Sequence, residues 1–123
     1  MWVSENPNPR GKDVGDCAIR AISLATDTPW EDIYLRLCIE GALKSDLPNA
    51  NDVWGSYLMD RGWYYHPIEH RFNYTIKDFC KDHPDGVYIV GTGDHAVCIK
   101  DGVIYDTWDS STKIPLYFFD SYK

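Results

Sequence analysis

Two different periodicities divide the pattern of apolar and polar residues along the chain. As far as about residue 81, apolar residues recur mainly at helical spacing, whereas after residue 86 they form short runs rich in β-branched and aromatic residues. Four such runs, 87–90, 96–100, 103–108 and 114–119, predict strands. Helices followed by strands predict an α+β fold, in which a buried N-terminal helix and a helical half pack on one face of a C-terminal antiparallel sheet of about four strands.

Four helices are expected before the strands. Residues 17–26 are apolar on nearly every side, which predicts a helix buried on most of its surface, with Asp16 as its N-cap. The segment 28–31, Thr-Pro-Trp-Glu, indicates a capping box that opens a second helix reaching about residue 43. A third helix is expected over 52–60, and a short one after Thr75.

The composition and charge bear on the number of domains and argue against nucleic-acid-binding and membrane-spanning proteins. The chain has 123 residues, 44% of them hydrophobic, which is enough for one core, so we expect a single domain over 1–123. Its net charge is −7, and no window of six residues holds more than two Lys or Arg, which argues against nucleic acid as a partner. The N-terminus lacks the features of a signal peptide, and no apolar run is long enough to span a bilayer. We therefore expect a cytoplasmic protein without a membrane partner, and the sequence leaves its oligomeric state open.

One of the four cysteines differs from the others in its surroundings. Cys38, Cys80 and Cys98 lie among apolar residues and are expected to be small buried side chains. Without an export signal, free thiols are expected rather than disulfides. Cys17 stands at the first turn of the predicted buried helix, where backbone N–H groups and the helix dipole favour the thiolate, which is the nucleophilic form. The alternative interpretation is that Cys17 has only a packing role at the start of this helix.

A histidine and an aspartate in the predicted sheet complement this cysteine. His95 opens a predicted strand and would supply a base with a pKa near neutrality, although a histidine at the rim of a loop is the simpler interpretation. Asp101-Gly102 is typical of a two-residue hairpin turn. That turn sets a register in which Asp106, rather than Asp94 or Asp109, lies within side-chain reach of His95. A carboxylate that orients a histidine is the third member of a catalytic triad.

Three short segments carry a resemblance to a known family. Gly15-Asp16-Cys17 resembles the Gly-x-Cys that starts the central helix of papain-like cysteine peptidases, and His95-Ala96-Val97 resembles their His-Ala-Val strand. Asp106-Thr107-Trp108 is similar to their Asn-Ser-Trp, and the order Cys, His, Asp or Asn is also theirs. The resemblance covers the core only, at a chain length nearer to the smallest bacterial and phage members. It implies a papain-like fold with Cys17, His95 and Asp106 as catalytic residues and Trp108 as a shield of the site.

The sequence departs from the family pattern at three points. Ala18 follows the cysteine where the family has Trp, and Asp106 replaces the usual Asn. The Gln that donates to the oxyanion in the family has no counterpart, because its usual place falls near residues 11 and 12. Asn8 or Asn6 is expected to substitute, with Asn8 preferred.

The resemblance implies a cysteine hydrolase, a peptidase or an isopeptidase or amidase, that acts on a peptide or protein substrate and needs no cofactor. Two alternatives remain open on the same fold. One is a catalytically inactive domain that binds a partner protein as an inhibitor or adaptor, which the missing Gln favours. The other is an acyltransferase.

Two further features are expected to be structural. His66 and His70 have the spacing of metal ligands on a helix, but Pro67 opposes a helix there, so no metal site is expected. Arg20 lies one turn beyond Cys17 on the apolar helix, and a buried arginine needs a partner, for which Asp16 or another carboxylate is available.

Overall fold

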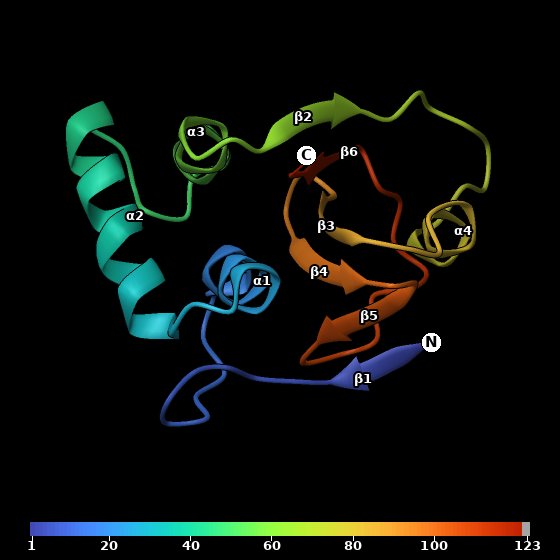
Figure 1. The fold of residues 1–123 in the computed structure, drawn as a ribbon, viewed down its shortest axis with the longest axis horizontal. Helices are drawn as coiled ribbons and strands as arrows, with labels where there is room; N and C mark the ends of the chain where they lie inside the picture. The colour runs from blue at the N-terminus through green and yellow to red at the C-terminus, as the bar shows by residue number, and fades with distance from the viewer. Residues whose placement is uncertain (122–123) are drawn as a thin grey trace.

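The fold combines four helices with one six-stranded mixed sheet within residues 1–121, which are the residues that the computed structural model describes (Figure 1). The last two residues of the domain expected over 1–123 lie outside this range. The helices are α1 (Cys17–Thr26), α2 (Trp30–Lys44), α3 (Asn51–Asp60) and α4 (Ile76–Asp82). The strands are β1 (Trp2–Ser4), β2 (Tyr64–Pro67), β3 (Val87–Gly91), β4 (Ala96–Lys100), β5 (Val103–Asp106) and β6 (Tyr117–Asp120).

The α+β class expected from the sequence is confirmed, but the sheet differs from the prediction. Its strand order is β1-β5-β4-β3-β6-β2, so it has six strands rather than about four. The neighbours are antiparallel except β1, which pairs in parallel with β5 and places Ser4 opposite Asp106. Strand β1 is not among the strands expected from the sequence, and it forms because the exposed edge of β5 offers it backbone partners.

Two of the expected helix caps are not formed. Asp16 occupies the N-cap position of α1, but its carboxylate makes no cap hydrogen bond and instead accepts from Arg20 and from the indole N–H of Trp30. Helix α2 begins at Trp30 with Pro29 at its N-cap position, and the hydroxyl of Thr28 donates to the Thr26 carbonyl instead of capping the helix. The short helix α4, in contrast, has a complete capping box between Thr75 and Asp78.

The hairpin between β4 and β5 has the predicted geometry. Asp101 and Gly102 both have positive φ angles, 51° and 77°, as a two-residue hairpin turn of the favoured twist requires. Lys100 pairs with Val103, and Cys98 pairs with Tyr105 two positions further along the ladder. The loop between β4 and β5 therefore has two residues, as predicted. The predicted register, which places Asp106 within side-chain reach of His95, is also confirmed.

The sheet is covered on both faces. Buried residues of α1, α2 and α3 pack with Ile89, Ala96 and Cys98 on one face. Buried residues of α4 pack with Val97 and Ile99 on the other, so the expectation that all helices lie on one face is wrong for α4. Figure 1 shows α1 and α4 on opposite sides of the strands β3 to β5. Strands buried on both faces are apolar at successive positions, as 96–99 is.

Among residues 1–121, no helix combines the length and the apolar character that crossing a membrane requires.

Candidate active site

Three segments that are distant in the sequence place the predicted triad in one location. Cys17 is the first residue of α1, His95 directly precedes β4, and Asp106 is the last residue of β5. Helix α1 packs against β4, and β4 pairs with β5, so the start of the helix meets the start of one strand and the end of the next. A buried helix and a hairpin of fixed register hold the three side chains on rigid elements.

His95 and Asp106 form a short, buried hydrogen bond. The ring Nε2 of His95 lies 2.6 Å from Oδ2 of Asp106, and the two side chains are only 10% and 2% exposed. Asp94 and Asp109 are engaged elsewhere, since Asp94 accepts from the Thr92 hydroxyl and Asp109 from the Ser111 amide. The prediction that Asp106 is the partner of His95 is therefore confirmed.

Three further donors converge on the Asp106 carboxylate. The backbone N–H of Thr107 donates to Oδ1 at 2.8 Å, the hydroxyl of Ser110 donates to Oδ2 at 3.1 Å, and Nη2 of Arg20 lies 3.4 Å from Oδ1. A buried carboxylate needs such partners to remain charged. Their arrangement fixes the orientation of the oxygen that bonds His95.

Arg20 joins this carboxylate to the start of α1. Its guanidinium bonds Asp16 through Nη1 and Asp106 through Nη2, and all three side chains are buried. The expectation of a partner for Arg20 is confirmed, and the structure supplies both Asp16 and a second carboxylate. Because Trp30 also donates to Asp16, the entry to α1 is tied to α2 and to the end of β5 by one buried polar network.

The Cys17 thiol is in hydrogen-bonding contact with the His95 ring. Burial raises the pKa of this thiol, but the hydrogen bonds from His95 and from the Ala96 N–H, with the positive charges of His95 and Arg20, outweigh burial and lower the pKa below its ordinary 9.0. Because Nε2 of His95 is bonded to Asp106, Nδ1 is the ring nitrogen that is left for the thiol. The thiolate is thus favoured at this position.

The environment of His95 favours the charged ring. Burial lowers the pKa of His95, but the hydrogen bonds to Asp106 and Cys17 outweigh this effect and raise the pKa to about 9. A lowered pKa of the cysteine beside a raised pKa of the histidine favours a thiolate–imidazolium pair. That pair can attack an electrophilic carbon and then donate a proton.

Trp108 lies over the histidine. Its ring centroid is 4.7 Å from that of His95 with the planes tilted by 41°, while the indole itself is 40% exposed. This contact is the one expected of a residue that covers the histidine–aspartate bond from solvent.

A cavity of about 370 Å³ opens onto the thiol and the imidazole. We call it the thiol cavity, and its walls include Gly15, Asn49, Asn51, Trp54 and Gly93 besides Cys17 and His95. The Cys17 backbone N–H has no hydrogen-bond partner among residues 1–121, as is usual in the first turn of a helix that lacks a side-chain cap. It is therefore available to an oxyanion.

The expected oxyanion residue, Asn8, lies in a different place. It lines the neighbouring cavity of about 420 Å³, which it shares with Trp30 and Tyr34, and it does not line the thiol cavity. Its side-chain oxygen accepts from the Arg10 amide, which holds the side chain in the loop before α1. The structure thus brings Cys17, His95, Asp106 and Trp108 together, and it leaves Asn8 outside that group.

Three residues of the site were not singled out from the sequence. Ser110 is fully buried and bonds Asp106, and its spacing of four residues from the aspartate would have been a usable signal. Asn51 donates to the Gly93 carbonyl at 2.9 Å and joins α3 to the loop before His95. Asn49 lines the thiol cavity and bonds no other residue within 1–121, and no sequence signal marks it.

The histidine pair considered for a metal has another role. His66 bonds Asp120 across the ladder between β2 and β6, at 2.7 Å. Within residues 1–121, no group of three or more His, Cys, Asp or Glu side chains is placed to hold a metal ion.

Comparisons of the chain with protein-family models, with curated proteins and with solved structures found no match. The geometry around Cys17 and the three short motifs are therefore the grounds for a functional proposal.

Proposed function

We propose that this chain is a papain-like cysteine hydrolase that cleaves an amide bond in a peptide or protein substrate. Cys17 is the nucleophile, His95 the general base and acid, and Asp106 the residue that orients His95. One observation carries the proposal: a half-buried Cys17 thiol whose pKa is lowered, in contact with a histidine that a buried aspartate holds at 2.6 Å. No cofactor is required, and a cytoplasmic location would keep the four thiols, which are all unpaired, reduced.

The reaction follows from the positions of the atoms. The Sγ thiolate of Cys17 attacks the carbonyl carbon, and the C=O electron pair moves to the oxygen, which the Cys17 N–H can bond. When the tetrahedral intermediate collapses, the C–N bond breaks and Nδ1 of His95 protonates the leaving amine. The remaining thioester is attacked by water, whose proton passes to His95. Breakage of the C–S bond then releases the carboxylic acid and restores the thiolate–imidazolium pair.

A second oxyanion donor is available within the thiol cavity. Of the two asparagines there, Asn51 donates a hydrogen bond to the Gly93 carbonyl, whereas the Asn49 amide makes no hydrogen bond to another residue within 1–121. We assign to Asn49 the role that the sequence favoured for Asn8. Asn49→Ala is expected to lower kcat by about 10²-fold, the lower end of the range for one oxyanion donor. Asn8→Ala, the matched control, should leave kcat within twofold.

The arrangement of elements supports the papain-like part of the proposal. The nucleophile stands at the start of a buried helix, and the histidine and its carboxylate stand on adjacent antiparallel strands of a sheet. The short segments that resemble the family are the same ones that meet at the thiol.

Selective alkylation tests the proposed nucleophile without knowledge of the substrate. The protein is treated with iodoacetamide at about pH 6, where an ordinary thiol is almost entirely protonated, and the sites are mapped by mass spectrometry. Cys17 should react far faster than Cys38, which is also half-buried and serves as the internal control. His95→Ala should remove this advantage. Equal rates for Cys17 and Cys38 would contradict the proposal.

Turnover of an activated ester then separates hydrolysis from the alternatives. With p-nitrophenyl acetate, a hydrolase gives a burst of p-nitrophenol followed by steady release. An acyltransferase would transfer the acetyl group to an added amine in preference to water. A domain that only binds a partner protein would give neither a burst nor turnover. In that case, Cys17→Ala would still act on the partner as the parent protein does.

A further inference from the structure

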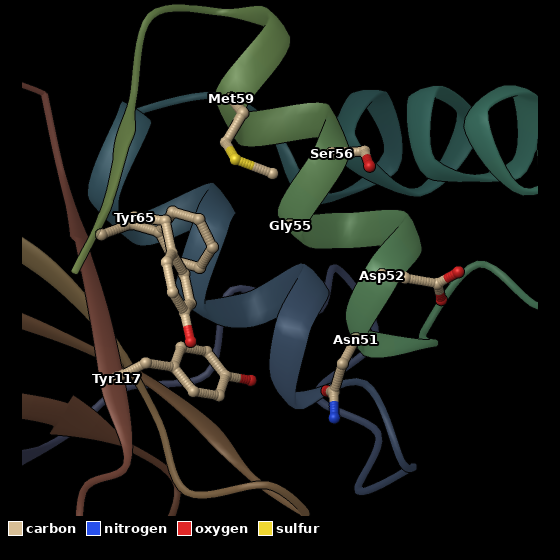
Figure 2. Close-up of a pocket in the computed structure, with 8 residues that line it drawn as sticks. Asn51, Asp52, Gly55, Ser56, Met59, Tyr65 and Tyr117 are labelled. Carbon is tan, nitrogen blue, oxygen red and sulfur yellow. The ribbon is translucent and has the colours of Figure 1, made fainter. Parts of the chain in front are cut away.

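A second hollow lies between helix α3 and the sheet, next to the thiol cavity. It has a volume of about 390 Å³. Its helical wall includes Gly55, Ser56 and Met59, and its sheet wall consists of Tyr65, Tyr117 and Phe119. We call it the aromatic trough. Figure 2 shows Met59 and Tyr65 facing each other across it, with Tyr117 below them.

The sheet wall is a rigid aromatic surface. The Tyr65 ring lies 5.5 Å from the rings of both Tyr117 and Phe119, measured between centroids, and the Trp54 ring supports Phe119 from the same distance. Rings held by one another lose little freedom when a ligand binds, so they form a preorganised surface.

One glycine forms part of the helical wall. A Cβ at Gly55 would lie 3.4 Å from the Phe119 ring, in van der Waals contact, so a larger side chain at this position would have to extend into the trough or displace the ring. One turn further along α3, Met59 is 50% exposed, and Tyr65 opposite is 48% exposed. Half-exposed large apolar side chains that face a common hollow are typical of a surface that is covered by a ligand.

The trough and the thiol cavity adjoin. Asn51 lines both of them, and Figure 2 shows its side chain and the Tyr117 ring directed toward the same space at the start of α3. The Tyr117 hydroxyl is buried and has no hydrogen-bond partner among residues 1–121. Burial raises the pKa of Tyr117 to about 12, with further contributions from Tyr65 and Cys17, so the hydroxyl remains a neutral donor near the thiol.

We propose that the aromatic trough binds a large uncharged side chain of the substrate, aromatic in the first instance, next to the bond that Cys17 attacks. The assignment rests on the proposed hydrolase function and adds the substrate class to it. A ring fits the volume and stacks on the sheet wall, and burial of such a ring is a large source of binding free energy. Asp52 borders the trough and Asp94 borders the thiol cavity, so an acidic side chain would be repelled.

Electrophilic peptides test this assignment without a natural substrate. The probes are acetyl-Gly-Gly-Gly vinyl sulfones in which each glycine in turn is replaced by Phe or by Glu, and a second series carries a phenyl group on the sulfone to cover the leaving-group side. The second-order rate constant for modification of Cys17 is measured by mass spectrometry. Phe at one position should raise this constant about tenfold or more over Gly, and Glu at the same position should not.

Substitutions in the wall of the trough test whether the preference for Phe over Gly arises from this surface. Met59→Glu places a charge at an exposed position of the trough and should reduce the Phe-over-Gly ratio to below about threefold. Leu43→Glu makes the same kind of change at a position of α2 that is 79% exposed and outside the trough, and should leave the ratio unchanged. Gly55→Leu fills the hollow and should have the effect of Met59→Glu, provided that circular dichroism shows a folded protein.

The outcomes separate the trough from the catalytic proposal. Iodoacetamide is too small to reach the trough, so a change in its rate with Cys17 in Met59→Glu reports only the effect of the new charge on the thiol. That effect cancels in the Phe-over-Gly ratio, which is therefore the readout for the trough. If iodoacetamide labels Cys17 selectively but no position prefers Phe, or if the preference survives Met59→Glu, the trough is not the binding site. If iodoacetamide shows no selectivity for Cys17 over the other cysteines, the hydrolase proposal itself is wrong, whatever the trough binds.

Discussion

Two histidine–aspartate pairs of nearly the same local geometry belong to one sheet, and one of them, His95 with Asp106, also contacts a cysteine thiol. His95 bonds Asp106 at 2.6 Å, and His66 bonds Asp120 at 2.7 Å, in each case through Nε2. Each ring also lies 4.7 Å from an aromatic ring, that of Trp108 for His95 and that of Phe118 for His66.

The two pairs differ in what surrounds them. The His66 side chain is 42% exposed, whereas that of His95 is 10% exposed and also contacts the Cys17 thiol. The carboxylate of Asp106 is 2% exposed and is held by a buried arginine, whereas that of Asp120 is 17% exposed. A histidine–aspartate bond is thus an ordinary cross-strand contact until burial, a fixed carboxylate and a nucleophile are added to it. The pair at His66 is a control that the protein itself provides.

The largest effect is expected from removal of His95, with removal of His66 as the matched control. His95→Ala should lower kcat/KM for ester hydrolysis by about 10³- to 10⁴-fold, because general base catalysis and thiolate formation are both lost. His66→Ala should leave kcat/KM within about twofold, since an exposed pair contributes little. Steady-state kinetics on both variants measure the contrast, and a loss of similar size in His66→Ala would mean that the two pairs are not distinct in function.

Arg20 is the group that the Asp106 pair has and the Asp120 pair lacks. Arg20→Met keeps the volume but leaves Asp16 and Asp106 without their buried cation, so the free energy of unfolding should fall by about 3–5 kcal/mol. Arg20→Lys retains the charge and should recover part of this loss, although one ammonium cannot bond both carboxylates in the way that the guanidinium fork does. Urea unfolding measures both. A change below about 1 kcal/mol in Arg20→Met would show that the network is not coupled to stability.

The two aspartates should differ by a smaller factor than the histidines. Asp106→Ala should lower kcat by about 10²-fold, less than His95→Ala, because it leaves the base in place but without orientation. Asp120→Ala should have no measurable effect on kcat. If Asp106→Ala and His95→Ala were equally inactive in a folded protein, Asp106 would have a role beyond orientation.

The pH dependence sharpens the same comparison. On the acid side, kcat/KM should rise tenfold per pH unit until the Cys17 thiol ionises, at a pH below 9.0 because its pKa is lowered. On the alkaline side it should fall above about pH 9, where His95 loses its proton. Asp106→Ala should move the alkaline limb to lower pH, because the bond to Asp106 raises the His95 pKa, whereas His66→Ala should leave both limbs in place.

Local signals in the sequence were sufficient for the hairpin and for the pair that depends on it. Asp101 and Gly102 have backbone angles that few other residue pairs tolerate, so the turn, the register and the contact between His95 and Asp106 followed from local chemistry. The helix at 17–26 was also predictable, because its apolar residues leave it no exposed face.

Features that depend on long-range contacts were not predictable. Strand β1 is a three-residue segment that forms only because the edge of β5 pairs with it, and the placement of Asn8 depends on the path of the loop before α1. Asp16 is a good N-cap in isolation, but Arg20 and Trp30 compete for its carboxylate. Tertiary contacts decide such choices, and a single sequence does not display them.

The first strand also has a consequence for how the protein is made. Trp2 donates to the carbonyl of Asp106, across a separation of 104 residues, and Glu5 donates to the same oxygen. A nascent chain that has not yet reached residue 106 can neither fix His95 nor close this edge of the sheet, so its Cys17 is an ordinary thiol. If Cys17 is the nucleophile, as proposed, synthesis from the N-terminus exposes it early and activates it late.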